Sequence, residues 1–337
     1  MPATIDDVAS RAGVSTKTVS RVLNGHTTVR AKLRTRIEIA IAELNYVPNA
    51  SARGLASNRS YLIALLYDNP TAGSNYVMEL IVGVLQACAE TPYNAVLHPF
   101  ETGDDLIQRI DGFVARHRPD ALILAPPHAN NLELMQRLDK LDVRYATISS
   151  KLQDPRIDIG FHERRAAADM VSHLVDLGHR RIGHIAGLKG HGARTWRLNG
   201  YRDALRQADI AFDKSLVVSG DFTFASGVVG ARALLDLDDP PTAIFAANDD
   251  VACGAIRAAY ERGWSVPEQI SVCGFDNTPV SLLVSPSLTT VHQPCREMGR
   301  QAVASVLDSI RAPMLERRVQ VPYELMIRGS TTAPRAP

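Results

Sequence analysis

The chain has 337 residues, which is too long for one small domain and suits a small head joined to a body of two lobes. Its composition, 45% hydrophobic and 22% charged, is typical of a soluble globular protein, and no run of about 18 apolar residues offers a membrane span. The net charge of +1 is unevenly spread: residues 1–60 hold nine Lys and Arg but four Asp and Glu, a net charge of +5, and the remainder carries −4. A basic head favours binding to phosphate.

The head begins with a predicted helix at Ile5–Ala12. Thr4 is its expected N-cap, with an acid three residues later as the reciprocal partner of a capping box. Gly13 ends the helix, because a residue in this position often needs a positive φ. Ser15 is then the expected cap of a second helix that runs to about Leu23.

In this second helix, Val19 and Val22 are expected to face the first helix. Four polar side chains are left to point outward: Thr16, Lys17, Ser20 and Arg21. A third helix follows from about Ala31. The pattern fits a plain three-helix bundle with a solvated basic face, but the small Ala9, the Gly turn and the apolar Val19 together favour a helix-turn-helix that reads the DNA major groove.

The head resembles the lactose-repressor/galactose-repressor (LacI/GalR) family of bacterial transcription regulators. Three segments carry the resemblance: Thr-Val-Ser-Arg-Val-Leu-Asn at 18–24, Asn-Tyr-Val-Pro-Asn at 45–49 and Ala-Arg-Gly-Leu at 52–55. The resemblance implies that Thr16, Lys17 and Arg21 contact base edges, as the chemistry of Arg and Lys allows. It assigns contacts with the DNA backbone to Ser20, Asn24 and Tyr46. It also places Thr4, Ser15 and Asn49 at the DNA.

The resemblance further implies a hinge helix at residues 49–57. This segment is short and contains Gly54, so on its own it is a marginal helix. In the family it folds when two copies meet over the minor groove, where Ala52 and Leu55 lie and Leu55 wedges into a central base step. The alternative is an ordinary linker that happens to contain two apolar residues.

From residue 61 onward, short apolar runs alternate with amphipathic stretches, which predicts parallel sheets with helices on both faces. The predicted strands lie at 61–67, 95–100, 121–125, 145–149, 181–186, 216–219, 243–247, 270–274 and 288–291. The predicted helices lie at 75–89, 104–116, 163–177, 195–207, 226–235, 250–262 and 295–310.

The predicted fold is therefore an N-terminal all-α helix-turn-helix head plus an α/β body of two Rossmann-like lobes. By the family resemblance, this body is similar to a periplasmic sugar-binding protein. The predicted divisions are a head at 1–47, a hinge helix and linker at 48–60, an N-terminal lobe at 61–160 plus 291–322, a C-terminal lobe at 161–290 plus 323–330, and a tail at 331–337.

Ligands of open α/β sheets bind beyond the carboxyl ends of the strands, and here those ends carry polar side chains. By the family resemblance, Arg197, Asn248 and Asp276 hold the hydroxyls of an effector, and Phe222 covers the sugar face unless it packs in the core. The predicted effector-binding residues are Asp68, Phe161, Arg197, Phe222, Asn248, Asp276 and Gln293. Asp249 is expected mainly to cap a helix.

One departure from the family concerns Ser149-Ser150, where many members have an Asp. The change removes a carboxylate from the N-terminal lobe wall and makes a simple hexose effector less plausible than an acidic sugar, an oligosaccharide or another metabolite. No cofactor and no metal site are expected, and the four scattered cysteines indicate free thiols.

These observations predict a homodimeric repressor of a carbohydrate-catabolic operon that binds a pseudo-palindromic DNA operator and responds to a sugar-like effector. The N-terminus lacks a signal-peptide pattern and the C-terminus lacks a leucine heptad, so we expect a cytoplasmic dimer rather than a tetramer. The alternative is a cytoplasmic sugar sensor whose head contacts a protein partner. No catalytic motif supports an enzyme.

Overall fold

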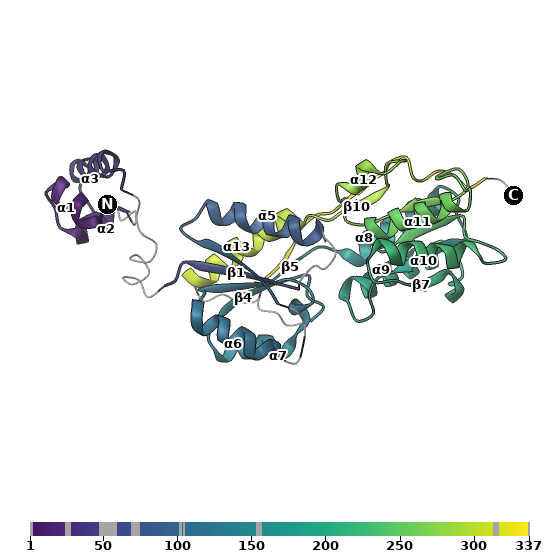
Figure 1. Cartoon of the computed structure of the whole chain (residues 1–337), viewed down its shortest axis with the longest axis horizontal. Helices are drawn as coiled ribbons and strands as arrows, with labels where there is room; N and C mark the ends of the chain where they lie inside the picture. The colour runs from purple at the N-terminus through teal and green to yellow at the C-terminus, as the bar shows by residue number, and fades with distance from the viewer. Residues whose placement is uncertain are drawn as a thin grey trace. The chain divides into compact units, whose positions relative to one another are not determined.

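The computed structural model describes residues 3–23, 28–46, 59–68, 75–100, 103, 105–152, 157–312 and 317–335. The chain forms two compact units, a head (Met1–Tyr61) and a body (Leu62–Pro337) (Figure 1). The predictions for Asn24, Asn49, Ala52 and Leu55, and for the hinge helix as a whole, lie outside the described residues.

The described residues of the head form α1 (Ile5–Ala12), α2 (Thr16–Leu23) and α3 (Ala31–Glu43). The predicted capping box is present, because the Thr4 hydroxyl accepts a hydrogen bond from the Asp7 N–H at 3.3 Å while the Asp7 carboxylate accepts one from the Thr4 N–H at 2.7 Å. The Thr4 hydroxyl also donates to the Asp7 carboxylate at 2.7 Å, and this bond, followed by the bond from the Thr4 N–H, lowers the pKa of Asp7. The sequence therefore predicts α1 correctly to both ends.

The turn between α1 and α2 depends on Gly13, which has a φ of 60° in the left-handed region. Ser15 then caps α2, since its hydroxyl accepts a hydrogen bond from the Thr18 N–H at 3.3 Å. The three helices enclose a small apolar core in which Val8, Val19 and Ile37 are fully buried. Burial on these faces leaves the opposite face of α2 to solvent.

The body begins with a six-stranded parallel sheet in the order β11-β5-β4-β3-β1-β2. Its strands are β1 (Leu62–Tyr67), β2 (Asn94–Pro99), β3 (Ala121–Leu124), β4 (Arg144–Ile148), β5 (Ile157–Gly160) and β11 (Arg317–Gln320). Helices cover both faces, as Figure 1 shows: α5 (Asn75–Ala89) and α13 (Cys295–Arg311) on one, α6 (Leu106–His117) and α7 (Leu132–Lys140) on the other. This is the arrangement expected of alternating strands and helices.

A second parallel sheet has four strands in the order β7-β6-β8-β9. Its strands are β6 (Ile182–Ala186), β7 (Val217–Ser219), β8 (Ala243–Ala246) and β9 (Ser271–Cys273). The helices α8 (Glu163–Asp176) and α9 (Gly192–Gln207) pack against each other, as do α10 (Phe224–Leu235) and α11 (Asp249–Glu261). The remaining described elements are η1 (His128–Asn130), η2 (Lys214–Leu216), α12 (Val280–Leu283), and the antiparallel pair β10 (Thr290–His292) and β12 (Glu324–Met326).

Close helix packing in the body depends on glycine at two crossings. A Cβ on Gly83 of α5 would lie 2.0 Å from the backbone oxygen of Arg296 in α13. A Cβ on Gly200 of α9 would lie 2.2 Å from the backbone oxygen of Arg164 in α8. The backbones of these helix pairs are therefore in direct contact, which fixes the α8–α9 face on which the candidate site is built.

The chain passes between the two sheets three times. It leaves the first sheet after β5 to enter α8, returns after β10 to form α13, and leaves again after β11 to form β12. Strands β5, β11 and β12 and helices α7 and α12 were not among the predicted elements. No helix in the described part of the chain is long and apolar enough to span a membrane, and the four cysteines are buried and unpaired.

Candidate functional site

The exposed face of α2 is the candidate DNA-binding surface. Lys17 and Arg21 are exposed on it, and Thr16 and Ser20 are half-buried. Within the described residues, neither Lys17 nor Arg21 has a hydrogen-bond or ion-pair partner in the head. Their charges are thus available to base edges and phosphates.

Other basic side chains of the head serve its own structure. Arg11 forms an ion pair with Glu43 at 2.7 Å, and Arg36 donates a hydrogen bond to the backbone oxygen of Gly13 at 3.3 Å. Of the other predicted DNA contacts, Tyr46 is half-buried against the core of the head, while Thr4 and Ser15 are the exposed caps of α1 and α2. The cations Lys17, Arg21, Arg11 and Arg36 are all exposed, but Arg11 and Arg36 have partners within the head.

In the body, the predicted effector residues converge on Arg197, a 4% exposed side chain of α9. Its guanidinium donates to Oε1 of Glu163 from Nε at 2.8 Å and forms an ion pair with the same oxygen through Nη2 at 2.7 Å. The Nη2 atom also lies 3.8 Å from Oδ1 of Asp276. Gln293 donates a hydrogen bond to that same Asp276 oxygen. We call Arg197, Glu163, Asp276 and Gln293 the arginine cluster.

Aromatic rings support this cluster. The guanidinium carbon of Arg197 lies 3.9 Å from the ring centre of Phe275 and 5.9 Å from that of Phe222. Phe222 has a φ of 70°, and its ring covers Gly187, where a Cβ would lie 2.1 Å from it. Phe161 packs beside Phe275, with their ring centres 6.2 Å apart. The structure thus brings Phe161 and Phe222 to the arginine cluster.

The helix-capping role that the sequence analysis gave to Asp249 belongs to Asn248. Asn248, not Asp249, is the N-cap of α11: its Oδ1 accepts from the Val251 N–H at 2.9 Å, and its Nδ2 donates to the Phe222 backbone oxygen at 3.0 Å. The prediction that Asp249 is mainly a cap was wrong. Asp249 is fully buried and accepts hydrogen bonds from Thr278 and Thr290, which tie α11 to the loop after β9 and to β10.

Burial governs the electrostatics of the cluster. It raises the pKa of Glu163, although Arg197 opposes the shift. It also raises the pKa of Asp276 well above its usual value, again against Arg197. Burial likewise raises the pKa of the adjacent Asp249 to about 6. Two carboxyl groups thus share one guanidinium in a low-dielectric environment, which suits hydroxyl donors better than a further acid.

One side chain of helix α5 also lies near the cluster. The pKa of the Tyr76 hydroxyl on α5 is raised well above its usual value, chiefly by burial and next by Cys295, Glu163 and Asp276, so this side chain lies close to the arginine cluster. Asp68 directly follows β1, and its charge acts on the nearby His128. Sequence reasoning missed Tyr76 and Glu163, because the packing of distant segments brings them to the cluster.

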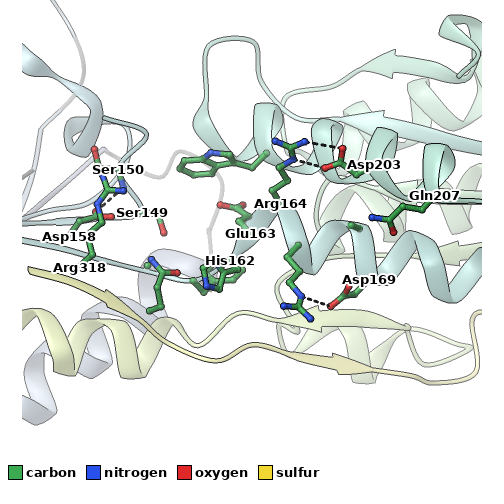
Figure 2. Close-up of a pocket in the computed structure, with 16 residues that line it drawn as sticks. Ser149, Ser150, Asp158, His162, Glu163, Arg164, Asp169, Asp203, Gln207 and Arg318 are labelled. Carbon is green, nitrogen blue, oxygen red and sulfur yellow. Dashed lines mark hydrogen bonds and ion pairs between the residues drawn. The ribbon is translucent and has the colours of Figure 1, made fainter. Parts of the chain in front are cut away.

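A cavity of about 830 Å³ adjoins the cluster, within the roughly 300–1,000 Å³ typical of small-molecule sites. Figure 2 shows Ser150, Asp158 and Arg318 of the first sheet on one side of it and Arg164, Asp203 and Gln207 on the other, with Glu163 and His162 between. Among the predicted effector residues, Phe161 alone lines this cavity.

The wall at Ser149-Ser150 is not free of carboxylate, contrary to the expectation from the sequence. Asp158 of the unpredicted strand β5 lines the cavity there and is 5% exposed. Its Oδ1 accepts a hydrogen bond from the Ser150 N–H at 3.0 Å and from the Thr147 hydroxyl at 2.8 Å. The carboxylate of this wall therefore comes from the neighbouring strand.

Comparisons with known proteins place the chain among bacterial regulators. Residues 4–49 match the model of the bacterial regulatory proteins of the lacI family, and residues 171–331 match a periplasmic binding protein-like domain. The ribose operon repressor of Escherichia coli (strain K12) is 35% identical over 338 residues, covering 97% of this chain and 99% of that protein.

Solved structures agree. A transcriptional regulator CelR–cellobiose complex is 32% identical with a TM-score of 0.75, covering 97% of this chain and 99% of that chain. A lac repressor dimer bound to operator and the anti-inducer ONPF is 30% identical with a TM-score of 0.82, covering 99% of this chain and 100% of that chain. Head and body are thus matched together, in the same order.

Proposed function

The chain belongs to the LacI family of bacterial regulatory proteins, and on that premise we propose that it is a homodimeric repressor of a carbohydrate-catabolic operon. It is a sequence-specific DNA-binding transcriptional regulator whose relatives are regulators rather than enzymes. We infer that it acts in the cytoplasm, where its DNA lies, and that it has no catalytic activity of its own. The exposed face of α2 is the observation that carries the proposal.

On that face, Arg21 and Lys17 are the residues assigned to base edges, since Arg and Lys donate to guanine acceptors in the major groove. Ser20 and Tyr46 are assigned to the DNA backbone, which positions the head without reading sequence. A two-fold dimer presents two such helices, so its operator is a near-palindrome.

We assign dimerisation to α5 and the sheet edge at β2. Met78 and Leu85 of α5 are 54% and 45% exposed, and Leu97 of β2 is 37% exposed. Apolar side chains of this size on neighbouring elements favour an interface between copies of the chain. Light scattering at micromolar concentration tests this assignment: a dimer supports it, and a monomer or tetramer contradicts it.

The effector is assigned to the arginine cluster with Phe161, Phe222, Asn248 and Asp68. The proposed lobes are residues 61–160 with 291–322 and residues 161–290 with 323–330, following the expected divisions. A ligand that contacts both lobes changes their relative angle only if it binds one arrangement more tightly than the other. Such a change alters the spacing of the two heads on DNA.

The test is selection of DNA by the purified protein from a random duplex pool, with and without a panel of sugars. Enrichment of a pseudo-palindrome that one sugar abolishes or strengthens supports both halves of the proposal. If a DNA sequence is enriched but no sugar changes the enrichment, the result contradicts the proposed sugar effector and still supports DNA binding. No enrichment in any condition, with cell extract added as a source of co-ligand, contradicts the repressor function.

Two variants separate the halves. Arg21→Ala is expected to lose operator preference and keep effector binding. Asp276→Ala is expected to bind the operator and stop responding to the effector, because its carboxylate is part of the arginine cluster. If each variant loses both activities, the division of labour between head and body is wrong.

A further inference from the structure

The cavity beside the arginine cluster extends well beyond the cluster itself. Glu163 lines the cavity and is bonded to Arg197, so the cavity and the cluster share this side chain. From there the cavity reaches Ser150 and Asp158 in one direction and Asp203 in the other, as Figure 2 shows. At about 830 Å³ it is large for a single sugar ring, and the space outside the cluster has no function in the proposal above.

An aromatic side chain, Trp196, lines this extra space. It directly precedes Arg197 on α9, and successive residues of a helix point about 100° apart. Arg197 is therefore directed into the cluster while the indole lies at the cavity. The Trp196 ring is half-buried and packs against Gly192. A Cβ at residue 192 would lie 3.1 Å from the ring, so a larger residue there would crowd it.

Most charged side chains around the cavity are paired with a charge of the opposite sign. Arg164 and Asp203 form a two-armed ion pair with N–O distances of 2.5 and 2.9 Å. Arg165 lies 3.9 Å from Asp169, and Glu163 is held by Arg197. An acidic ligand thus gains little from these arginines, whereas hydroxyl groups can bond to the remaining lone pairs and N–H groups.

A half-buried aromatic ring among carboxylate, amide and guanidinium groups suits one class of ligand. Sugar rings have an apolar face that packs on an indole and a rim of hydroxyls that needs donors and acceptors. Gln207 and Ser150 add amide and hydroxyl groups to this lining. The cavity offers such a surface next to the cluster, to which the proposed function assigns one set of hydroxyls.

We propose that this cavity is a second sugar subsite, in which Trp196 packs on one ring while the arginine cluster holds another. The effector is then a neutral oligosaccharide of at least two rings. This inference rests on the proposed effector function of the cluster and specifies its ligand. Of the effector classes named in the sequence analysis, it selects the oligosaccharide over the acidic sugar.

The two tryptophans of the chain give a direct readout. Trp264 packs at the rim of the core of the second sheet, so Trp264→Phe leaves Trp196 as the only indole reporter. This variant of the full chain is titrated with neutral monosaccharides, neutral disaccharides and trisaccharides, hexose phosphates and uronic acids. We expect saturable changes in Trp196 emission with one or more of the neutral oligosaccharides, and not with the monosaccharides or the acids.

The second measurement is calorimetric titration of Trp196→Ala, with Trp264→Phe as the matched control. Losing the aromatic contact is expected to weaken oligosaccharide binding by roughly tenfold or more. Binding of the monosaccharide that corresponds to one of its rings is expected to stay within about twofold of wild type. Emission from Trp264 in Trp196→Ala checks that the body is folded.

Three outcomes overturn the proposal. The first is a neutral monosaccharide that binds as tightly as every oligosaccharide tested. The second is tight binding of an acidic or phosphorylated sugar, or of no sugar in the panel. The third is an oligosaccharide whose affinity is unchanged in Trp196→Ala. The first and third leave the proposed repressor function intact, because that function requires a sugar-like effector but no second subsite.

Discussion

In the head, Lys17 and Arg21 stand exposed on α2, whereas in the body Arg197 is 4% exposed and bonded to Glu163. Both regions use basic side chains, but with opposite electrostatic states. The cations of α2 are hydrated until a polyanion replaces water and counterions. The guanidinium of Arg197 is desolvated in advance and neutralised by the protein's own carboxyl groups.

This difference separates the two binding events in their response to salt. Binding through exposed cations weakens steeply as salt rises, because counterions are released from DNA. Binding at the arginine cluster exchanges internal hydrogen bonds for bonds to the ligand, with little long-range charge to be screened. The effector affinity is therefore expected to depend far less on salt than the operator affinity.

The largest expected effect is that of Arg21→Ala on operator preference. A good arginine–base contact is worth roughly 1–3 kcal/mol, and a dimer makes it twice, so the preference for operator over random DNA should fall by roughly a hundredfold or more. Fluorescence anisotropy with labelled duplexes measures this. Arg11→Ala is the matched control, because it removes the same charge from a side chain already paired with Glu43. Equal losses in both variants would contradict the assignment of Arg21 to base edges.

The next effect is on the stability of the body. Among the described residues, Glu163→Gln leaves the more distant Asp276 as the one carboxyl group beside the buried guanidinium, and we expect a loss of about 3 kcal/mol in the free energy of unfolding. Urea denaturation followed by tryptophan emission reports on the body, since Trp196 and Trp264 both lie in it. Glu261→Gln is the control: its half-exposed ion pairs with Arg232 and Arg257 are expected to contribute less than about 1 kcal/mol. Similar losses of unfolding free energy in Glu163→Gln and Glu261→Gln would show that burial of the cluster contributes little to stability.

Acid should also act on the body. Burial lowers the pKa of His184 to about 4, so below about pH 6.5 the unfolded chain binds a proton that the folded body does not. Stability from this site is complete above that pH and is lost as the pH falls toward 4. Between pH 7 and 4.5, His184→Gln is expected to lose roughly 2–3 kcal/mol less than wild type.

Urea denaturation at each pH measures this difference, with the exposed His117→Gln as control. Asp249, whose pKa is raised to about 6, changes stability in the opposite sense, but equally in all three proteins. Parallel curves for wild type and His184→Gln would contradict the role of this histidine.

The smallest effect compares a glycine of the head with one of the body. Gly13→Ala is expected to cost about 1 kcal/mol, because φ is 60° there although no atom lies closer than 3.8 Å to the new Cβ. Gly112→Ala, within α6 and with nothing within 4 Å, is expected to stabilise its helix by about 0.5–1 kcal/mol. Hydrogen exchange of the head and body amides separates the two effects. Stability changes of the same sign in Gly13→Ala and Gly112→Ala would mean that the backbone conformation of the glycine does not decide whether alanine stabilises or destabilises the protein.

The same contrast explains what the sequence could predict. The boundaries of α1, its capping box and the Gly13 turn depend on residues a few positions apart, and all are confirmed. The convergence of Arg197, Asp276 and Gln293 was reached through family resemblance, since these residues come from segments far apart in the chain. Nothing in local periodicity indicates that Glu163 holds Arg197.

The missed strands have particular physical reasons. β5 is four residues long and carries Asp158 in its middle, a residue that strands disfavour, yet hydrogen bonds from Thr147 and Ser150 satisfy that carboxylate. β11 begins with two arginines and lies at the edge of its sheet, where charged side chains are common. The wrong expectations for Asp249 and for the Ser149-Ser150 wall follow from contacts that only the folded sheets create.

The three passages of the chain between the sheets have a consequence for fragments of the protein. The first sheet with its helices comes from two separate stretches of the chain, whereas the second sheet with its helices is one stretch, residues 163–283. The first lobe therefore cannot be produced by simple truncation of the gene. A protease that cuts one passage, for example after Phe161, leaves two pieces held by the other two passages and by the packed sheets. Such a cleaved body should elute as one particle in size-exclusion chromatography. On a denaturing gel it should separate into two bands, whose sizes show which passage was cut.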